Sequence, residues 1–344
     1  MTADITTMPA GPEIVAGEEP EPERRRRRKA LLFLLLLIGL FALFALTIWY
    51  LLFRQPIPLP PILPTAIPHY STSIYGADTP VGIAVTPSGD RIYVAETGGD
   101  KVVRIFDAGG RDLGTMEPPA TTGAEHVPVY VAIDPLTSEV YVTDRPTGSV
   151  YVYDRDGAYQ REYRPEAVAE GWQPVGIGFD KDGNVYVSDW ADENQAIKKF
   201  DRAGTLVLTY GESEKLSYPN GVVVASDGRL YVTDSNNGRL LVYAPTGELV
   251  SKVGRGAGAG NLGLPRGLAA DGQGRLFVVD SSGNGVLVYR TLVEGERQPE
   301  HLGFFGGHGI EDGKFSFPIG IAVDDRGRVY VSDTANGRIQ IWSY

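Results

Sequence analysis

The chain has 344 residues, an apolar fraction of 42% and a formal net charge of −11 at pH 7. It contains no cysteine, which excludes disulfide bonds, thiolate metal sites and a cysteine nucleophile. The acidic excess lies in residues 55–344, which hold 37 acidic and 25 basic residues. This balance argues against a nucleic-acid-binding surface.

The N-terminal region is predicted to be a membrane anchor. Residues 1–29 combine a stretch without apolar periodicity, expected to be a disordered tail, with the six consecutive cations of residues 24–29. Residues 30–53 carry no charge, and a helix of this length, at about 1.5 Å per residue, crosses a bilayer. Because the cations precede the apolar stretch and only Arg54 follows it, we expect a cytoplasmic N-terminus and an exported remainder.

A cleaved signal peptide is the competing interpretation of this segment. Its apolar core would span about 7 to 15 residues and end in a small-residue cleavage site, and neither feature is present. We therefore expect an uncleaved signal anchor.

Residues 54–68 are rich in proline and are expected to form a stiff stalk. An arginine-rich anchor and the absence of cysteine suit a protein of the bacterial cell surface.

The rest of the chain repeats one unit six times. The last copy, residues 318–344, reads PIGIAVDDRGRVYVSDTANGRIQIWSY. Its short apolar runs, separated by tight-turn signals, are typical of consecutive antiparallel strands. Such a sheet has two faces to bury, so six units predict a six-bladed β-propeller with four strands per blade. The copies begin at Pro80, Pro128, Pro174, Pro219, Pro265 and Pro318.

The last copy stops after its third strand, which would leave an open sheet edge. Residues 73–76, just before the first copy, end in an aromatic residue and glycine, as two of the outer strands upstream do. We therefore expect residues 69–76 to supply the missing fourth strand and to close a propeller domain of residues 69–344.

Residues 309–340, GIEDGKFSFPIGIAVDDRGRVYVSDTANGRIQ, resemble the unit of the NHL-repeat propellers, and weaker copies cover residues 69–344. That unit runs G-x-x-x-G-x-F-x-x-P-x-G-I-A-V-D, then G-x-V-Y-V-x-D, then N-x-R-I-Q. The resemblance implies an all-β, six-bladed propeller, here preceded by a single transmembrane helix. Since one fold hosts many chemistries, the resemblance does not assign a function.

The predicted ligand site lies on the channel rim. The residue after each repeat proline should line the channel mouth, and four of these six residues are aliphatic, whereas Asn220 and Arg266 are polar and lie on adjacent blades. Polar and aromatic groups that converge on a concave rim are typical of a ligand site. The alternative is that they only line a solvated funnel. The full predicted rim comprises Asn220, Arg266, Tyr218, Gln173, Trp172 and Trp190.

An acidic residue ends each expected second strand. A catalytic acid is not needed on every blade, so we expect these residues to cap the turn that follows through hydrogen bonds to its backbone. They are Glu96, Asp144, Asp189, Asp234, Asp280 and Asp333.

Two enzyme classes of this architecture offer alternatives. The amidating lyases hold zinc through histidines placed after the repeat proline, and none of the four histidines here has that position. The gluconolactonase-like propellers hold calcium in the channel mouth. Residues 218–221 resemble their asparagine motif, but Arg266 stands where they have an aspartate. We therefore predict no catalytic residue, no metal ligand and no cofactor, calcium being the ion that the alternative would require.

These observations predict an extracellular, membrane-anchored module that binds or scaffolds a protein, peptide or glycan ligand. The alternative is a propeller hydrolase or lyase, gluconolactonase-like or amidating-lyase-like, with a metal in the channel mouth. The expected partners are the membrane, through one transmembrane helix, and an extracellular ligand.

Overall fold

The computed structural model describes residues 21–53, 67–119, 125–165, 168, 171–191, 195–256 and 259–344. The chain divides into two units, residues 1–62 and 63–344, and each is described by itself. In the first unit, helix α1 spans Glu21–Phe53. Its stretch Arg25–Thr47 is long and apolar enough to cross a membrane.

The start of α1 corrects one expectation. The predicted disordered tail extended through residue 29, but the helix begins at Glu21 and includes the basic run. Arginine and lysine are good helix formers, and each added residue gains one backbone hydrogen bond, so the helix continues past the apolar stretch. Residues 1–20 of the predicted tail and residues 54–66 of the predicted stalk lie outside the described residues.

The second unit consists of six four-stranded antiparallel sheets, here called blades 1 to 6 in chain order. Blades 1 and 2 contain β2 (Pro80–Val85), β3 (Arg91–Glu96), β4 (Val103–Asp107), β5 (Asp112–Met116), β6 (Pro128–Ile133), β7 (Val140–Asp144), β8 (Ser149–Tyr153) and β9 (Tyr159–Tyr163). Blades 3 and 4 contain β10 (Pro174–Phe179), β11 (Val185–Asp189), β12 (Ala196–Phe200), β13 (Leu206–Tyr210), β14 (Pro219–Val224), β15 (Leu230–Asp234), β16 (Arg239–Tyr243) and β17 (Leu249–Val253). Blades 5 and 6 contain β18 (Pro265–Ala270), β19 (Arg275–Asp280), β20 (Gly285–Arg290), β21 (His301–Gly306), β22 (Ile321–Val323), β23 (Val329–Asp333), β24 (Arg338–Ser343) and β1 (His69–Tyr75).

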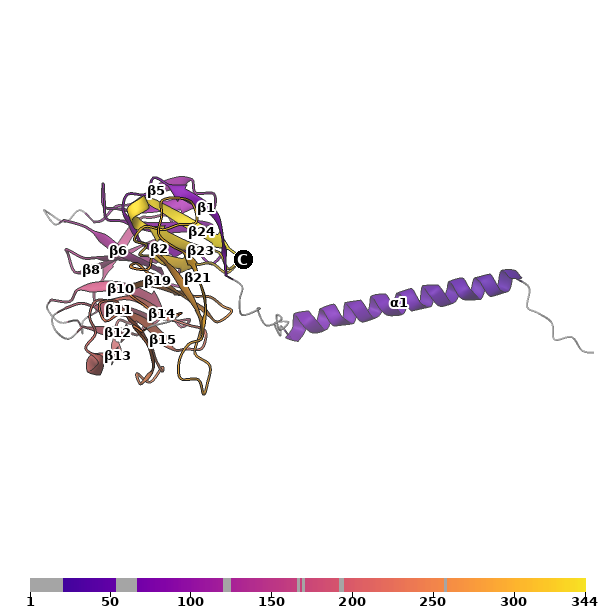
Figure 1. Ribbon diagram of the computed structural model, residues 1–344. Helices are drawn as coiled ribbons and strands as arrows, with labels where there is room; N and C mark the ends of the chain where they lie inside the picture. The colour runs from indigo at the N-terminus through magenta and orange to yellow at the C-terminus, as the bar shows by residue number, and fades with distance from the viewer. Residues whose placement is uncertain are drawn as a thin grey trace, which may run out of the picture. The chain divides into compact units, whose positions relative to one another are not determined.

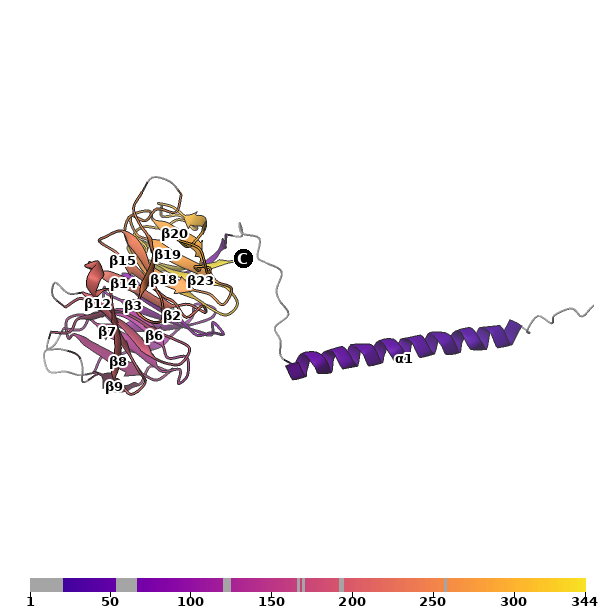
Figure 2. The same ribbon diagram turned by 90° about the horizontal axis from the view of Figure 1, so that it is seen from below.

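The first strands of the blades form a closed ring. In chain order β2 contacts β6, β6 contacts β10, β10 contacts β14, β14 contacts β18 and β18 contacts β22, and β22 contacts β2 again. Within a blade the strands follow one another outward, as β7, β8 and β9 do in Figure 2. The repeats thus form the six-bladed β-propeller that the sequence predicted. Two 3₁₀ helices lie in the connections, at Glu212–Glu214 and Thr334–Asn336.

The ring closes by pairing its two chain ends. Strand β1 lies antiparallel to β24, with His69 opposite Ser343 and Tyr75 opposite Arg338. Figure 1 shows the purple β1 beside the yellow β24. The first strand of the propeller is therefore the outer strand of its last blade, the position that we expected for residues 69–76.

Hydrophobic side chains fill the interfaces between neighbouring blades. Each interface has its own buried cluster, because alternate residues of the inner strands face opposite neighbours. Tyrosines of the second strands span these interfaces. The Tyr93 hydroxyl of blade 1 donates to the Arg155 carbonyl of blade 2 at 2.8 Å, and the ring of Tyr93 is fully buried.

The aspartates at the ends of the second strands hold more than the turn that follows them. Asp280 accepts hydrogen bonds from the backbone N–H groups of Ser282 and Gly283, both at 3.1 Å, which is the capping role expected. It also accepts from Gly263 at 2.6 Å and Leu264 at 3.0 Å, in the loop that enters the first strand of its own blade. One carboxylate thus joins two loops at the same face.

Ring closure yields a stability prediction. Ile74 on β1 is 6% exposed and packs in the cluster between blades 6 and 1, so Ile74→Ala should cost about 2–5 kcal/mol of unfolding free energy. Exposed Thr72 on the same strand is the control, and Thr72→Ala should stay within about 0.5 kcal/mol. Urea unfolding of the two variants measures both values. Equal stability of the two variants would show that β1 does not close the ring.

The aspartate cap yields a pH prediction. Burial alone would raise the pKa of Asp280, but its backbone hydrogen bonds outweigh burial and lower this pKa. The carboxylate therefore stabilises the fold above its unfolded pKa of about 3.9, and the contribution is lost as pH falls through the lower folded pKa. At pH 7, Asp280→Asn should cost about 1.5–3 kcal/mol, and the difference from wild type should shrink below pH 4. Urea unfolding at several pH values measures this difference in unfolding free energy, with Asp325→Asn at an exposed position as the control. A difference that does not depend on pH would contradict the stabilising role of the Asp280 carboxylate.

Candidate functional site

The structure brings the two polar residues of the predicted rim together. Asn220 on β14 is 3% exposed, and its amide nitrogen donates to the Tyr218 carbonyl at 2.9 Å and to Ser235 Oγ at 2.5 Å. Its Oδ1 faces Arg266 on β18, whose Nη1 lies 3.5 Å away. The Asn220 amide is therefore engaged on both sides by the protein itself.

This arrangement bears on the calcium alternative. A calcium ion held by the Asn220 oxygen would meet the Arg266 guanidinium in its first coordination shell, and calcium prefers carboxylate and carbonyl oxygens. In the described part of the chain, no three His, Cys, Asp or Glu side chains gather in the way that a metal ion would need.

Trp190 links two blades. Its indole Nε1 donates to the Pro219 carbonyl of the next blade at 2.7 Å. In three other blades a hydroxyl group at the corresponding position donates a hydrogen bond to the carbonyl oxygen of the repeat proline of the next blade. These hydroxyl groups belong to Ser235, Ser281 and Thr334. The position directly after the strand-ending aspartate thus has a structural role that the sequence analysis did not predict.

Of the predicted rim, Tyr218 and Gln173 are the residues exposed to solvent. Tyr218 is 45% exposed, adopts a left-handed backbone with φ of 53°, and packs edge-on against Trp190 with ring centroids 4.7 Å apart. Gln173 lies beside this pair, since its carbonyl accepts the Trp190 backbone N–H at 2.9 Å.

Trp172 corrects the predicted rim. Its side chain is 9% exposed and packs in the hydrophobic cluster between blades 2 and 3, with its ring centroid 5.8 Å from that of Phe200. An indole buried in this way contributes packing rather than an open binding surface, because the neighbouring blade covers it.

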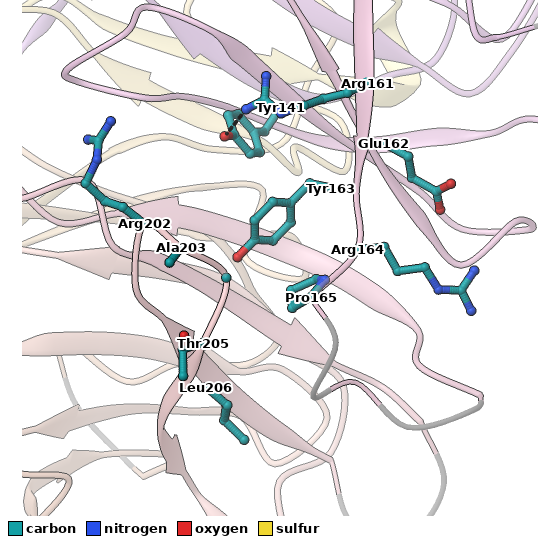
Figure 3. Close-up of a pocket in the computed structure, with 11 residues that line it drawn as sticks. Tyr141, Arg161, Glu162, Tyr163, Arg164, Pro165, Arg202, Ala203, Thr205 and Leu206 are labelled. Carbon is teal, nitrogen blue, oxygen red and sulfur yellow. Dashed lines mark hydrogen bonds between the residues drawn. The ribbon is translucent and has the colours of Figure 1, made fainter.

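A groove lies elsewhere, on the outer part of blades 2 and 3. It has a volume of about 500 Å³ and runs between the end of β9 and the turn before β13. Figure 3 shows Tyr163 in its centre, with Arg202 and Arg164 on opposite sides. The residues that line it are Tyr141, Arg161, Glu162, Tyr163, Arg164, Pro165, Arg202, Ala203, Gly204, Thr205 and Leu206.

The three arginines of the groove differ in their partners. Arg161 is paired: its guanidinium donates to Glu139 at 2.5 and 2.9 Å and to Tyr141 Oη at 3.0 Å. Arg164 and Arg202 are exposed, and neither guanidinium donates a hydrogen bond to a residue that the structure describes. The groove therefore offers two exposed cations without a hydrogen-bond acceptor among the described residues, and the charge of Arg202 also acts on nearby Glu139.

A tyrosine completes this groove. The Tyr163 hydroxyl is buried and has no hydrogen-bond partner among the described residues, and burial raises its pKa. A protonated phenol can donate to an acceptor that enters the groove. The sequence analysis missed this site because its cations belong to two different repeats. The arginines that flank Glu162 and Tyr163, on a strand that is otherwise polar, were the available signal.

The NHL repeat family model matches residues 216–243 and 315–342. Among curated proteins, the chain is 28% identical over 201 residues to Protein SUPPRESSOR OF QUENCHING 1, chloroplastic, of Arabidopsis thaliana, which covers 46% of this chain and 19% of that protein. It is 29% identical over 123 residues to NHL-repeat-containing protein 4 of Homo sapiens, covering 33% of this chain and 97% of that protein. The chain thus spans about a fifth of the length of the first relative.

Solved structures share the fold at low sequence identity. A streptogramin B lyase structure aligns with a TM-score of 0.55 and 17% identity, over 80% of this chain and 98% of that one. A nidogen/laminin complex contains a chain that aligns with a TM-score of 0.51 and 20% identity, over 65% of this chain and 81% of that one. At such identities the likeness shows the fold alone. The chain thus contains two segments that match the NHL repeat, within a six-bladed β-propeller fold.

Proposed function

We propose that this protein is a membrane-anchored binding module whose propeller lies outside the cytoplasm and holds an acidic segment of a partner protein in the groove between blades 2 and 3. The groove carries the proposal, because its two exposed arginines and its buried phenol have donors without a hydrogen-bond acceptor among the described residues. Arginine and tyrosine are enriched at the energetic centres of protein interfaces, and guanidinium groups match carboxylates in geometry.

The anchor supports the location of the module. Helix α1 contains a span long and apolar enough for a bilayer, and the basic residues lie at its N-terminal end. Positive residues are retained on the cytoplasmic side of a membrane, and this charge distribution supports a location of the propeller on the other side.

Charge reversal in the groove tests the proposed ligand class. A fluorescent peptide of eight glutamates should bind the full chain in detergent, and Arg164→Glu with Arg202→Glu should weaken binding at least about tenfold, because each charge-assisted hydrogen bond contributes about 1.5–3 kcal/mol. Fluorescence anisotropy measures the affinity.

The matched control changes the net charge equally at a distance from the groove. Arg297→Glu with Arg326→Glu, two exposed positions on blades 5 and 6, should leave the affinity unchanged. If both double variants weakened the affinity for the peptide equally, the effect would come from the net charge alone, and the groove would be rejected as the binding site. A sulfated hexasaccharide that displaces the peptide at lower concentration would reassign the groove to glycans.

Labelling of single cysteines tests the topology, since the chain has no cysteine of its own. The two positions are Lys181, in an exposed turn of blade 3, and Thr2, which precedes the apolar helix in the sequence. Each is replaced by cysteine in a separate variant. In intact bacterial cells, a membrane-impermeant maleimide should label position 181, and position 2 only after permeabilisation. The reverse pattern would place the propeller in the cytoplasm.

A further inference from the structure

The inner ring of the propeller departs from its repeat on three blades, at Tyr130, Asn220 and Arg266. Five first strands carry glycine two residues after the repeat proline, and a Cβ there would collide with the next blade; at Gly221 it would lie 2.6 Å from the Arg266 carbonyl oxygen. Blade 2 carries Tyr130 at this position instead. In blade 2 the regular pairing of the first and second strands resumes two residues after the proline, with Tyr130 opposite Thr143, whereas it resumes three residues after the proline in blades 3 and 4. This local difference accommodates a side chain at position 130.

Another departure is Arg266 on blade 5. It occupies the position after the repeat proline, where four blades have an aliphatic residue. Strands β6 and β18 are three places apart in the closed ring of six, so Tyr130 and Arg266 lie on opposite sides of the channel. These two residues therefore occupy opposite blades of the ring, and the ring of Tyr130 also packs in the cluster between blades 2 and 3.

Both side chains leave buried donors without acceptors. Tyr130 is 9% exposed, and neither its hydroxyl nor Arg266 Nε has a hydrogen-bond partner among the described residues. Burial raises the pKa of the Tyr130 hydroxyl and the charge of Arg266 opposes this effect, so the hydroxyl is a protonated donor within reach of that charge. Buried polar atoms in folded proteins are almost always paired.

Arg266 also lacks a counter-ion. The described polar atom facing its guanidinium is the amide oxygen of Asn220, and no described carboxylate lies within ion-pair distance, although the chain has an excess of acidic residues. A partly buried cation without a carboxylate is costly unless an anion comes from outside. Val81 and Val175, at the equivalent position of two other blades, are 7% and 1% exposed and pack in the interfaces between blades.

We propose that the central channel binds a small monovalent anion of the carboxylate class between Arg266 and Tyr130. Arg266 supplies the charge and the Nε–H donor, and Tyr130 supplies a hydroxyl donor from the opposite blade. Asn220 orients the guanidinium through its Oδ1 and is itself held by Ser235. This site is independent of the groove between blades 2 and 3.

Sodium formate is the probe. The melting temperature of the full chain in detergent is followed while formate replaces p-toluenesulfonate at constant ionic strength. We expect a saturable rise of a few degrees, because a ligand that binds only the folded state stabilises it by mass action. A featureless, non-saturating response would overturn the proposal, and so would a stabilisation by calcium that chelator reverses.

Two variants separate the site from a general salt effect. Arg266→Met keeps the length of the side chain and should abolish the saturable rise. Tyr130→Phe removes one oxygen from a packed ring, preserves the fold, and should raise the formate dissociation constant about tenfold, the loss of one hydrogen bond to a charged group. Exposed Arg326→Met is the control and should behave as wild type. An unchanged formate response in Tyr130→Phe would overturn the assignment even if Arg266→Met failed to fold.

Discussion

The pairing of β1 with β24 is the contact on which the rest of the propeller depends. Each blade packs mainly against its two neighbours in the described residues, so without this pairing blade 6 would expose an edge and the ring could open. The contact joins residues about 270 positions apart in the chain, and its loop-closure entropy is offset by backbone hydrogen bonds and buried apolar surface. The carboxylate of Asp312 adds side-chain bonds from Tyr75 at 2.6 Å and Arg338 at 3.1 Å.

Once closed, the ring is held at its centre by backbone contacts that leave little room for side chains. Hydroxyl and indole donors near the ends of the second strands bind carbonyls of the next blade, as Thr143 does to Val175 at 2.8 Å and Thr334 does to Pro80 at 2.7 Å. Most polar side chains near the axis therefore make hydrogen bonds between neighbouring blades. Arg266 Nε and the Tyr130 hydroxyl are exceptions, because they have no hydrogen-bond partner among the described residues, and the proposed anion site rests on them.

The outer groove obeys a different constraint. Its residues lie on a strand edge and a turn, where substitutions do not disturb the ring, so Arg164 and Arg202 can occupy exposed positions there while Arg161 is paired with Glu139. The likeness to lyases and to a chain of a nidogen/laminin complex shows how widely this scaffold is shared, and it leaves chemistry to the residues grafted onto each copy. In this chain, the grafted residues are cations and phenols, which suit recognition of acidic groups.

The sequence by itself determined the number of blades, the strand that closes the ring and the apolar N-terminal helix, because these follow from repeat period, alternation and hydrophobic length. It also placed Asn220 beside Arg266, since a fixed repeat puts equivalent positions side by side. Only the tertiary structure decided that Trp172 is covered by a neighbouring blade, that Asn220 is satisfied internally, and that arginines from two repeats share a groove. Burial and partners depend on which surfaces meet, and local pattern does not contain that information.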